Sequence, residues 1–258
     1  MSQATQIRRL IIEMTIPEIT HHLGSAMSCV EILDTLYADI LKVDPKNSAW
    51  TKRDIFILSK GHAASALYAT LHLKGFFNKK ELLKFDQNDG WSEHASFGVP
   101  GVELSTGSLG HGLPVGLGFA LSFKQAQKLN RVFVLMSDGE LNEGSNWEAI
   151  NFAAHHKLNN VTAIVDLNGF QGYDKTSQVI NLKPLAAKFA AHGWEVFSGD
   201  GHDQAWLKQV LLQPTTTQPR VVIAKTIKGK GLGEWEGQFA SHYHSLTANE
   251  KTKLLNNL

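Results

Sequence analysis

VFVLMSDGELNEGSNWEAINFAAHHKLNNVTAIVDLNGFQ, residues 132–171, is the stretch of this 258-residue chain that decides its fold. An apolar run from Val132 to Met136 ends at Asp138-Gly139, and a second run from Val161 to Val165 ends at Asn168-Gly169. Between the runs, apolar residues recur at three- and four-residue spacing, which predicts a helix: Trp147, Ile150, Ala154 and Leu158. Strand, helix and strand in this order predict a βαβ unit with parallel strands.

Polar side chains follow both predicted strands at the point where each ends. Because parallel strands end at the same sheet edge, we expect Asp138 and Asn168 to lie close together, where open α/β sheets bind ligands. Two oxygen donors there suit Mg²⁺, and Gly139 lets the backbone approach a phosphate. Taken singly, each Asp-Gly or Asn-Gly pair is an ordinary turn. Their matching positions favour a binding site. Ser145 and Glu148 fit a capping box at the start of the intervening helix.

An Asp-Gly pair followed thirty residues later by a strand-end Asn resembles the thiamine diphosphate motif. SDGELNEGSNWEA and VDLNGFQ are similar to the transketolase version of it, with Ser137 where a glycine is usual. The resemblance implies a thiamine diphosphate-binding α/β fold, with a mostly parallel central sheet and helices on both faces. It also implies Mg²⁺ (or Ca²⁺ or Mn²⁺) held by Asp138, Asn168 and the main-chain carbonyl of Phe170. Gly139 and Asn168 would contact the cofactor.

Composition limits the class of protein. A chain of 258 residues can form one α/β domain, which we expect to span residues 1–258. Its formal net charge of +1 argues against a nucleic-acid partner. The single cysteine, Cys29, excludes an internal disulfide framework and suits a reducing cytosol. The chain has no apolar run of membrane-spanning length and no signal-peptide pattern, so we expect a soluble cytoplasmic protein.

Two helices are predicted near the N-terminus, over residues 3–20 and 28–41, with a break at residues 21–25. A histidine in such a connector is ordinarily a polar linker residue. HHLGSAMSCVEIL, however, resembles the family's Gly-His-x-Gly-Gly segment, in which the histidine faces the substrate. His22 matches that histidine, and His21 replaces the customary glycine.

A short buried strand over residues 54–58 leads into a helix that ends near Leu73. His62 lies at the start of this helix, where backbone amides and the helix dipole favour an anion, although it could simply cap the helix. RDIFILSKGHAASALYA resembles the family segment whose histidine contacts the diphosphate, so His62 is assigned to the cofactor. Residues 85–103 are rich in turn formers and predict irregular chain. His94 matches the substrate-facing histidine of the family's Gly-His-Pro, although both flanking residues differ.

LSTGSLGHG, residues 104–112, opens a predicted helix over residues 113–128. A dinucleotide-binding fingerprint fails here, because the spacing is G-x-x-G-x-G and no ribose-binding acid follows a strand. Gly116 and Gly118 inside the helix indicate close packing or the approach of a ligand. The segment resembles the family's Thr-Gly-x-Leu-Gly loop, which implies that three residues line the thiamine rings: Gly107, Ser108 and Leu109.

The C-terminal part is predicted to continue as a loop (169–180), a helix (185–191), a strand (194–197), a turn (199–203), a helix (204–212) and a strand (219–225). His202 and Asp203 suggest a metal site, but turn and N-cap chemistry account for both residues. KGKGLGE, with its lysines and glycines, could bind phosphate. In the family this loop leads to a histidine near the diphosphate and substrate. His242 is the better match, with His244 as its competitor.

The family resemblance implies a transketolase, in which thiamine diphosphate carries the hard chemistry of moving a two-carbon ketol unit from a ketose to an aldose, or between their phosphates. His22, His94 and His242 would exchange protons with the sugar, and Glu143 would relay across a subunit interface. The glutamate that activates the cofactor comes from a pyrimidine domain of a neighbouring chain.

No residues remain here for that pyrimidine domain. We therefore expect a C-terminal partner subunit that carries it, and two copies of each subunit in a heterotetramer. Two alternatives stay open: a subunit of another thiamine diphosphate enzyme, similar to the α subunit of a 2-oxo-acid dehydrogenase, or a non-catalytic, cofactor-binding regulatory member.

Overall fold

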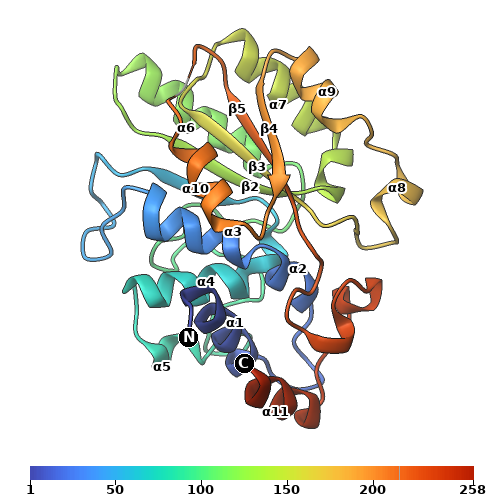
Figure 1. Cartoon of the computed structure of the whole chain (residues 1–258). Coiled ribbons are helices and arrows are strands. Elements are labelled where there is room, and N and C mark those ends of the chain that lie inside the picture. The colour runs from blue at the N-terminus through green and yellow to red at the C-terminus, as the bar shows by residue number, and fades with distance from the viewer. Residues whose placement is uncertain (215) are drawn as a thin grey trace.

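Five parallel strands form one sheet in the order β1-β2-β3-β5-β4 (Figure 1). The computed structural model describes residues 1–214 and 216–258. The strands are β1 (Ile55–Leu58), β2 (Val132–Ser137), β3 (Val161–Leu167), β4 (Glu195–Asp200) and β5 (Arg220–Lys225). Val132 pairs with Val161 and Ser137 with Asp166, so β2 and β3 run in register to their carboxyl ends. The predicted βαβ unit is confirmed.

Helices cover both faces of the sheet, as the sequence predicts. Alternate strand residues face two separate cores, because successive side chains of a strand point to opposite faces. Phe133 and Leu135 of β2 face a core built with α1 (Gln3–Met14), α3 (Val30–Thr35), α4 (Ala64–Lys74) and α10 (Gln204–Leu212). Val132, Val134 and Met136 face a second core, built with α6 (Gly112–Gln125), α7 (Gly144–His155) and α9 (Leu185–Ala191). The strands are buried on both faces, which explains their unbroken apolar runs.

The N-terminal helices differ from the predicted ranges. The first helix ends at Met14 rather than at residue 20, and Thr15 is extended. Pro17 lies just beyond, and a residue that precedes proline avoids the helical region. The second predicted helix begins five residues early, as α2 (Leu23–Ser28), and breaks at Cys29 before α3. A short π-helix, η1 (Leu36–Ile40), follows α3.

Later elements agree more closely with the prediction. The helices over 185–191 and 204–212 and the irregular stretch 85–103 are confirmed, and Asp203 caps α10 by accepting from the amides of Ala205 and Trp206. The predicted capping box of α7 is wrong: Glu143 is the N-cap, and the Ser145 hydroxyl donates to the Gly110 carbonyl instead. The predicted 169–180 loop contains a short helix, α8 (Thr176–Val179).

Two further helices were not predicted, α5 (Lys79–Leu82) and α11 (Ala248–Asn257). A capping box of Thr247 and Glu250 starts α11, which packs against α1, so the two chain ends lie near each other (Figure 1). The remaining short elements are 3₁₀-helices: η2 (Gly61–Ala63), η3 (Gly139–Asn142), η4 (Gly233–Trp235) and η5 (Phe239–His242).

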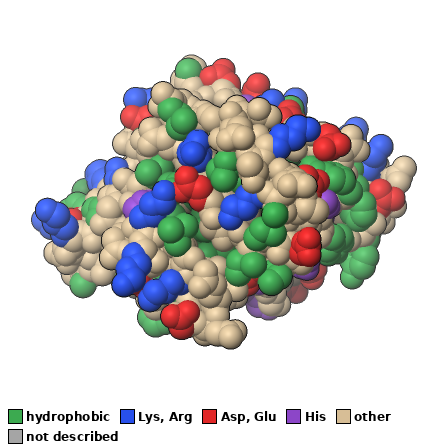
Figure 2. Space-filling model, turned by 90° about the horizontal axis from the view of Figure 1, so that it is seen from below, with side chains coloured by type: hydrophobic (Ala, Val, Ile, Leu, Met, Phe, Trp, Pro, Cys, Tyr) green, Lys and Arg blue, Asp and Glu red, His purple; other side chains and the backbone are tan. Residues whose placement is uncertain are grey.

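The surface carries charges of both signs. On the face shown in Figure 2, Lys and Arg side chains are interspersed with Asp and Glu. Within residues 1–214 and 216–258, no helix is long and apolar enough to cross a membrane. Cys29 is a free thiol buried in the first core, and burial raises its pKa to about 12.

Candidate functional site

A cavity of about 420 Å³ opens at the carboxyl ends of β2 and β3. Segments far apart in the chain meet around it: the start of α2, η2, the loops before α6 and after β2 and β3, and η5. Most residues predicted as site residues line this cavity: His22, His62, His94, Gly107, Leu109, Gly139, Glu143, Asn168, Phe170 and His242. Ser108 is exposed outside it, and Asp138 is buried behind it.

Four histidines converge on one side of this cavity. The His22 ring lies at the centre, with centroids 5.4 Å from His62, 5.7 Å from His94 and 5.0 Å from His242. His22 has φ 60°, in the left-handed region, so the chain turns sharply as it enters α2. The His22 amide donates to the His242 carbonyl at 3.0 Å, which fixes the two histidine segments to each other.

Three of the four histidines are held uncharged: His22, His62 and His242. Burial, reinforced by the neighbouring His94, lowers the pKa of His22 to about 4. Burial together with Lys228 lowers the pKa of His242 to about 3, and burial together with Lys60 lowers that of His62 well below its ordinary value. At neutral pH these three rings are therefore imidazoles, each with one nitrogen that donates and one that accepts.

Several buried polar atoms around the cavity lack a hydrogen-bond partner in the described chain. They are Nδ1 of His22, Nδ1 of His242, Nε2 of Gln171, and both amide atoms of Asn142. Leaving a buried polar group unpaired is unfavourable, and native proteins rarely tolerate it. These atoms are arranged for a polar ligand rather than for an empty apolar pocket.

The deep end of the site is built on Asp138. Its side chain is fully buried and accepts from the amides of Gly139 at 2.9 Å and Gly169 at 2.8 Å, and from the Thr176 hydroxyl at 2.9 Å. All three donors are neutral. Burial, with Asp166 nearby, raises its pKa to about 6. A buried carboxylate without a cationic partner is costly, and a metal ion would relieve that cost.

The other predicted metal ligands lie next to Asp138. Asn168 is adjacent to Gly169, and its Oδ1 accepts from the Phe170 amide at 3.1 Å. Asn168 lines both the main cavity and a smaller one of about 350 Å³, which Asp138 also lines. Within the described residues no group of three His, Cys, Asp or Glu side chains is placed so that it could hold a metal ion by itself. A cation here would therefore need the amide and main-chain oxygens that the sequence predicts, which suit Mg²⁺.

Sequence reasoning missed two buried lysines. Lys228 lines the cavity at 1% exposure, and its Nζ donates to the Ser25 hydroxyl at 3.1 Å. Burial, with Lys60 nearby, lowers its pKa to about 8. Lys60 forms a buried ion pair with Asp166 and donates to the Ser25 carbonyl at 3.0 Å. The KGKGLGE composition indicated a phosphate loop, but nothing in it indicated which lysine is buried.

The structure separates His242 from its competitor. His242 is buried and lines the cavity. His244 stacks on Trp235 with ring centroids 3.9 Å apart, and its Nε2 lies 3.0 Å from Glu250 Oε1. His244 thus belongs to the start of α11 and not to the cavity.

Glu143 lines the cavity close in sequence to a surface groove, which Ser145 and Glu148 line. Glu143 is exposed at the N-cap of α7 and lines the cavity edge. The groove, of about 450 Å³, lies between α6 and α7 and is mostly apolar, with Leu117, Leu121 and Phe152 among its lining residues. His111, which follows the predicted cofactor loop, lines this groove and not the cavity.

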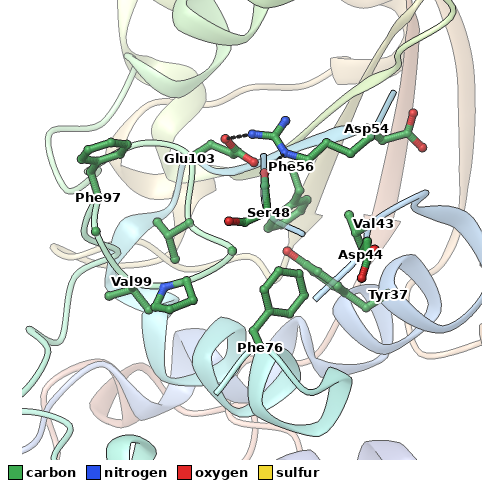
Figure 3. Close-up of a pocket in the computed structure, with 15 residues that line it drawn as sticks. Tyr37, Val43, Asp44, Ser48, Asp54, Phe56, Phe76, Phe97, Val99 and Glu103 are labelled. Carbon is green, nitrogen blue, oxygen red and sulfur yellow. Dashed lines mark hydrogen bonds and ion pairs between the residues drawn. The ribbon is translucent and has the colours of Figure 1, made fainter. Parts of the chain in front are cut away.

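A second cavity, of about 330 Å³, shares no lining residue with the first (Figure 3). Tyr37 points its hydroxyl into it, Phe76 forms another wall, and the ion pair of Arg53 and Glu103, 2.8 Å long, closes one side. None of the site residues predicted from the sequence lines it.

Comparison with known proteins identifies what this architecture resembles. The family model described as "Transketolase, thiamine diphosphate binding domain" matches residues 2–258. One apulose-4-phosphate transketolase subunit, from Phocaeicola vulgatus, is 36% identical, with 96% of this chain and 89% of that one covered. The 6-deoxy-6-sulfo-D-fructose transketolase subunit of a Clostridium species is 38% identical, covering 95% and 90%.

Longer proteins match over only part of their length. Human transketolase is 33% identical, covering 98% of this chain but 41% of its own. Among solved structures, transketolase from Campylobacter jejuni superposes with a TM-score of 0.91 at 33% identity, covering 99% of this chain and 42% of that one.

Proposed function

The chain belongs to the transketolase family, as its thiamine diphosphate-binding domain, and we propose that it is the cofactor-binding subunit of a two-subunit transketolase. Relatives of similar length are named as transketolase subunits, which supports this interpretation over a piece of a single-chain enzyme. Residues 1–258 would form one domain, working in the cytosol.

The observation that carries the proposal is one cavity that brings together charged groups and a cluster of histidines. Lys228 and the four histidines line this cavity together, and the buried carboxylate of Asp138 lies behind it, next to Asn168. A pyrophosphate with its Mg²⁺ suits these charged groups, because a carboxylate prefers the metal and a buried ammonium prefers phosphate oxygens. Asp138, Asn168 and the Phe170 carbonyl would hold the metal, for which Ca²⁺ or Mn²⁺ could substitute.

The remaining cofactor contacts follow from the cavity lining. Gly139 would admit the diphosphate closely, since a β-carbon there would lie 2.6 Å from that of Gln171. His62 and Lys228 would donate to its oxygens, and Gly107 and Leu109 would contact the thiamine rings. Ser108 is exposed outside the cavity, so its proposed contact would have to come from its backbone. The cofactor, when bound, supplies the carbon nucleophile that makes and breaks the bond next to a ketose carbonyl.

The chain's own residues would then manage the protons of the sugar. Neutral imidazoles can accept a proton from one hydroxyl and donate to another, which suits His22 and His242 to a polyol substrate. His94, whose ring lies 5.7 Å from that of His22, would act on the sugar beside them. His242, whose ring lies 5.8 Å from that of the cofactor-binding His62, would contact both the cofactor and the sugar. Glu143, at the cavity edge, would relay to a neighbouring subunit. We propose a ketose, or its phosphate, as donor and an aldose, or its phosphate, as acceptor.

A partner must complete this site. The cavity lies at the surface of this chain, and reactive carbon chemistry needs water excluded. A C-terminal transketolase subunit with a pyrimidine domain would cover the cavity. The apolar groove between α6 and α7, beside Glu143, supports contact with a second copy of this chain. Together these give a heterotetramer of two copies of each subunit.

The decisive experiment combines binding and turnover. Calorimetric titration of the chain with thiamine diphosphate, with and without Mg²⁺, measures the cofactor site directly. Ketol transfer is then assayed across a ketose–aldose panel, for the chain alone and with the pyrimidine-domain subunit. We expect transfer only in the mixture. Turnover by the isolated chain would refute the two-subunit proposal, and binding without transfer by any mixture would favour a non-catalytic role.

A further inference from the structure

A polar cluster outside the cavity joins three distant segments of the chain. Arg8 of α1 makes a two-pronged ion pair with Glu31 of α3, at 2.6 Å and 2.9 Å. The Nδ1 atom of His202, in the turn before α10, lies 2.9 Å from Glu31 Oε2. Burial raises the pKa of Glu31, but hydrogen bonds from His202 and Arg8 outweigh it and lower the value to about 2. The carboxylate is therefore charged and can only accept.

These contacts define the tautomer of His202. Because Glu31 accepts, Nδ1 of His202 carries the proton. Its other nitrogen, Nε2, lies 2.9 Å from the backbone nitrogen of Ile227, whose N–H donates to it. Both ring nitrogens are thus used within the chain, and Asp203 is used as the cap of α10. This arrangement leaves His202 no free ring nitrogen for the metal site that the sequence suggests, and among the described residues no cluster of His, Cys, Asp or Glu around it could hold a metal ion.

Ile227 directly precedes Lys228, the buried lysine of the cavity. The segment that carries them is tied to the rest of the chain by further hydrogen bonds. The Gly229 amide donates to the Gly24 carbonyl at 2.8 Å, the Gly237 amide donates to the Lys228 carbonyl at 2.7 Å, and Arg8 Nε donates to the Lys230 carbonyl at 2.9 Å. The same Arg8–Glu31–His202 cluster thus holds this segment on both sides of Lys228. Gly229 and Gly231 have φ of 72° and 91°, so the segment is sharply turned and its geometry depends on such anchors.

We propose that His202 is a positioning residue for the cofactor cavity: its Nε2 holds the Ile227 amide and thereby keeps Lys228 against Ser25, facing the cavity. The inference rests on the proposed function, because it assigns Lys228 to the diphosphate. His202 touches neither substrate nor cofactor. It acts through one backbone hydrogen bond, so its loss changes cofactor affinity more than the rate at saturating cofactor.

Two substitutions separate the two bonds of His202. In His202→Asn the side-chain amide can replace Nδ1 and donate to Glu31, but nothing reaches Ile227. In His202→Gln the longer side chain places an oxygen near the position of Nε2, where it accepts from Ile227. His155→Asn, at an exposed position on α7, is the matched control. The assembled enzyme is assayed for the dissociation constant of thiamine diphosphate with Mg²⁺, for kcat at saturating cofactor, and for Tm.

We expect His202→Asn to weaken cofactor binding by about fivefold to tenfold, the equivalent of one lost hydrogen bond, with kcat nearly kept. His202→Gln should bind within about twofold of the wild type, the scatter we assign to one altered contact. Equal cofactor affinity in both variants would overturn the proposal. It would also be overturned if the loss of cofactor affinity in each variant matched its loss of Tm and not the loss of the hydrogen bond to Ile227. A wild-type enzyme that binds no thiamine diphosphate would instead refute the proposed function itself.

Discussion

The backbone amide of His22 donates to the carbonyl of His242 at 3.0 Å, and the two imidazole rings lie 5.0 Å apart. The two residues are 220 positions apart in the sequence. This one bond joins the start of α2 to η5, so each histidine's place in the cavity depends on the other segment. Both rings keep an unpaired Nδ1 within the described chain, available to a ligand.

The histidine cluster should remain uncharged over the physiological range. Burial lowers the pKa of His22 to about 4 and that of His242 to about 3, so their neutral forms are lost only as the pH falls toward those values. We expect kcat/KM of the assembled enzyme to show no step near pH 6.5 from these residues.

His22→Ala should lower kcat/KM about a hundredfold or more with cofactor affinity nearly kept. An unchanged kcat/KM would remove His22 from the proton-transfer role.

Asp138 should make the stability of the metal-free chain depend on pH. Its pKa of about 6 lies above the ordinary 3.8, so the native state binds more protons than the unfolded state between these values. Stability therefore falls as the pH rises from about 4 to about 6, by on the order of 1 kcal/mol or more. Denaturant unfolding of wild type and Asp138→Asn across this range isolates the contribution, because only the wild type should show it.

The same variant tests the metal assignment. Asp138→Asn keeps the size of the side chain but removes its charge, so Mg²⁺-dependent binding of thiamine diphosphate should weaken at least about a hundredfold, as expected for a lost charged ligand. Calorimetric titration measures it, with circular dichroism as the check on folding. Wild-type affinity in a folded Asp138→Asn chain would contradict the assignment.

Lys228 should give cofactor binding an alkaline limit. Its pKa is lowered to about 8, first by burial and then by Lys60, and only the charged form attracts a diphosphate. Affinity should be greatest below pH 8 and fall above it by up to about tenfold per pH unit. Lys228→Met should bind weakly at pH 7 and lose this dependence. Lys208→Met, which removes an exposed lysine, is the control. If cofactor affinity as a function of pH were the same in Lys228→Met and Lys208→Met, the contact between Lys228 and the diphosphate would be excluded.

Two glycines of α6 should respond oppositely to alanine. A β-carbon at Gly116 would lie 2.8 Å from Val134 Cγ2 of β2, whereas one at Gly118 would meet nothing within 4 Å. In the isolated chain, Gly116→Ala should destabilise by about 1–3 kcal/mol through overpacking. Gly118→Ala should stabilise by about 0.5–1 kcal/mol, the ordinary helix preference for alanine. Thermal unfolding compares the two.

Gly118 also probes the proposed contact between copies of the chain, because it lines the groove between α6 and α7. If a second copy packs there, Gly118→Ala should stabilise the isolated chain yet shift the assembly toward smaller species in sedimentation. Assembly equal to that of the wild type would argue against this groove as the contact.

Local patterns were enough to predict much of the fold. The strand–helix–strand unit of residues 132–167 and the helices over 185–191 and 204–212 follow from periodicity, because a buried parallel strand and an amphipathic helix leave distinct spacings. Helix ends near the N-terminus were less accurate. Their limits depend on how α1, α2 and α3 pack, which outweighs weak local preferences.

The sequence by itself determined which residues could bind a metal and a phosphate, since Asp138-Gly139 and Asn168-Gly169 follow strands whose ends must coincide in a parallel sheet. Only the tertiary structure decided that His242 rather than His244 lines the cavity, that Lys228 is buried there, and that burial keeps His22 and His242 uncharged. The physical reason is the distance along the sequence over which each property is determined. Strand ends are set by neighbours along the chain, whereas burial and electrostatic coupling arise between segments that only the complete fold brings together.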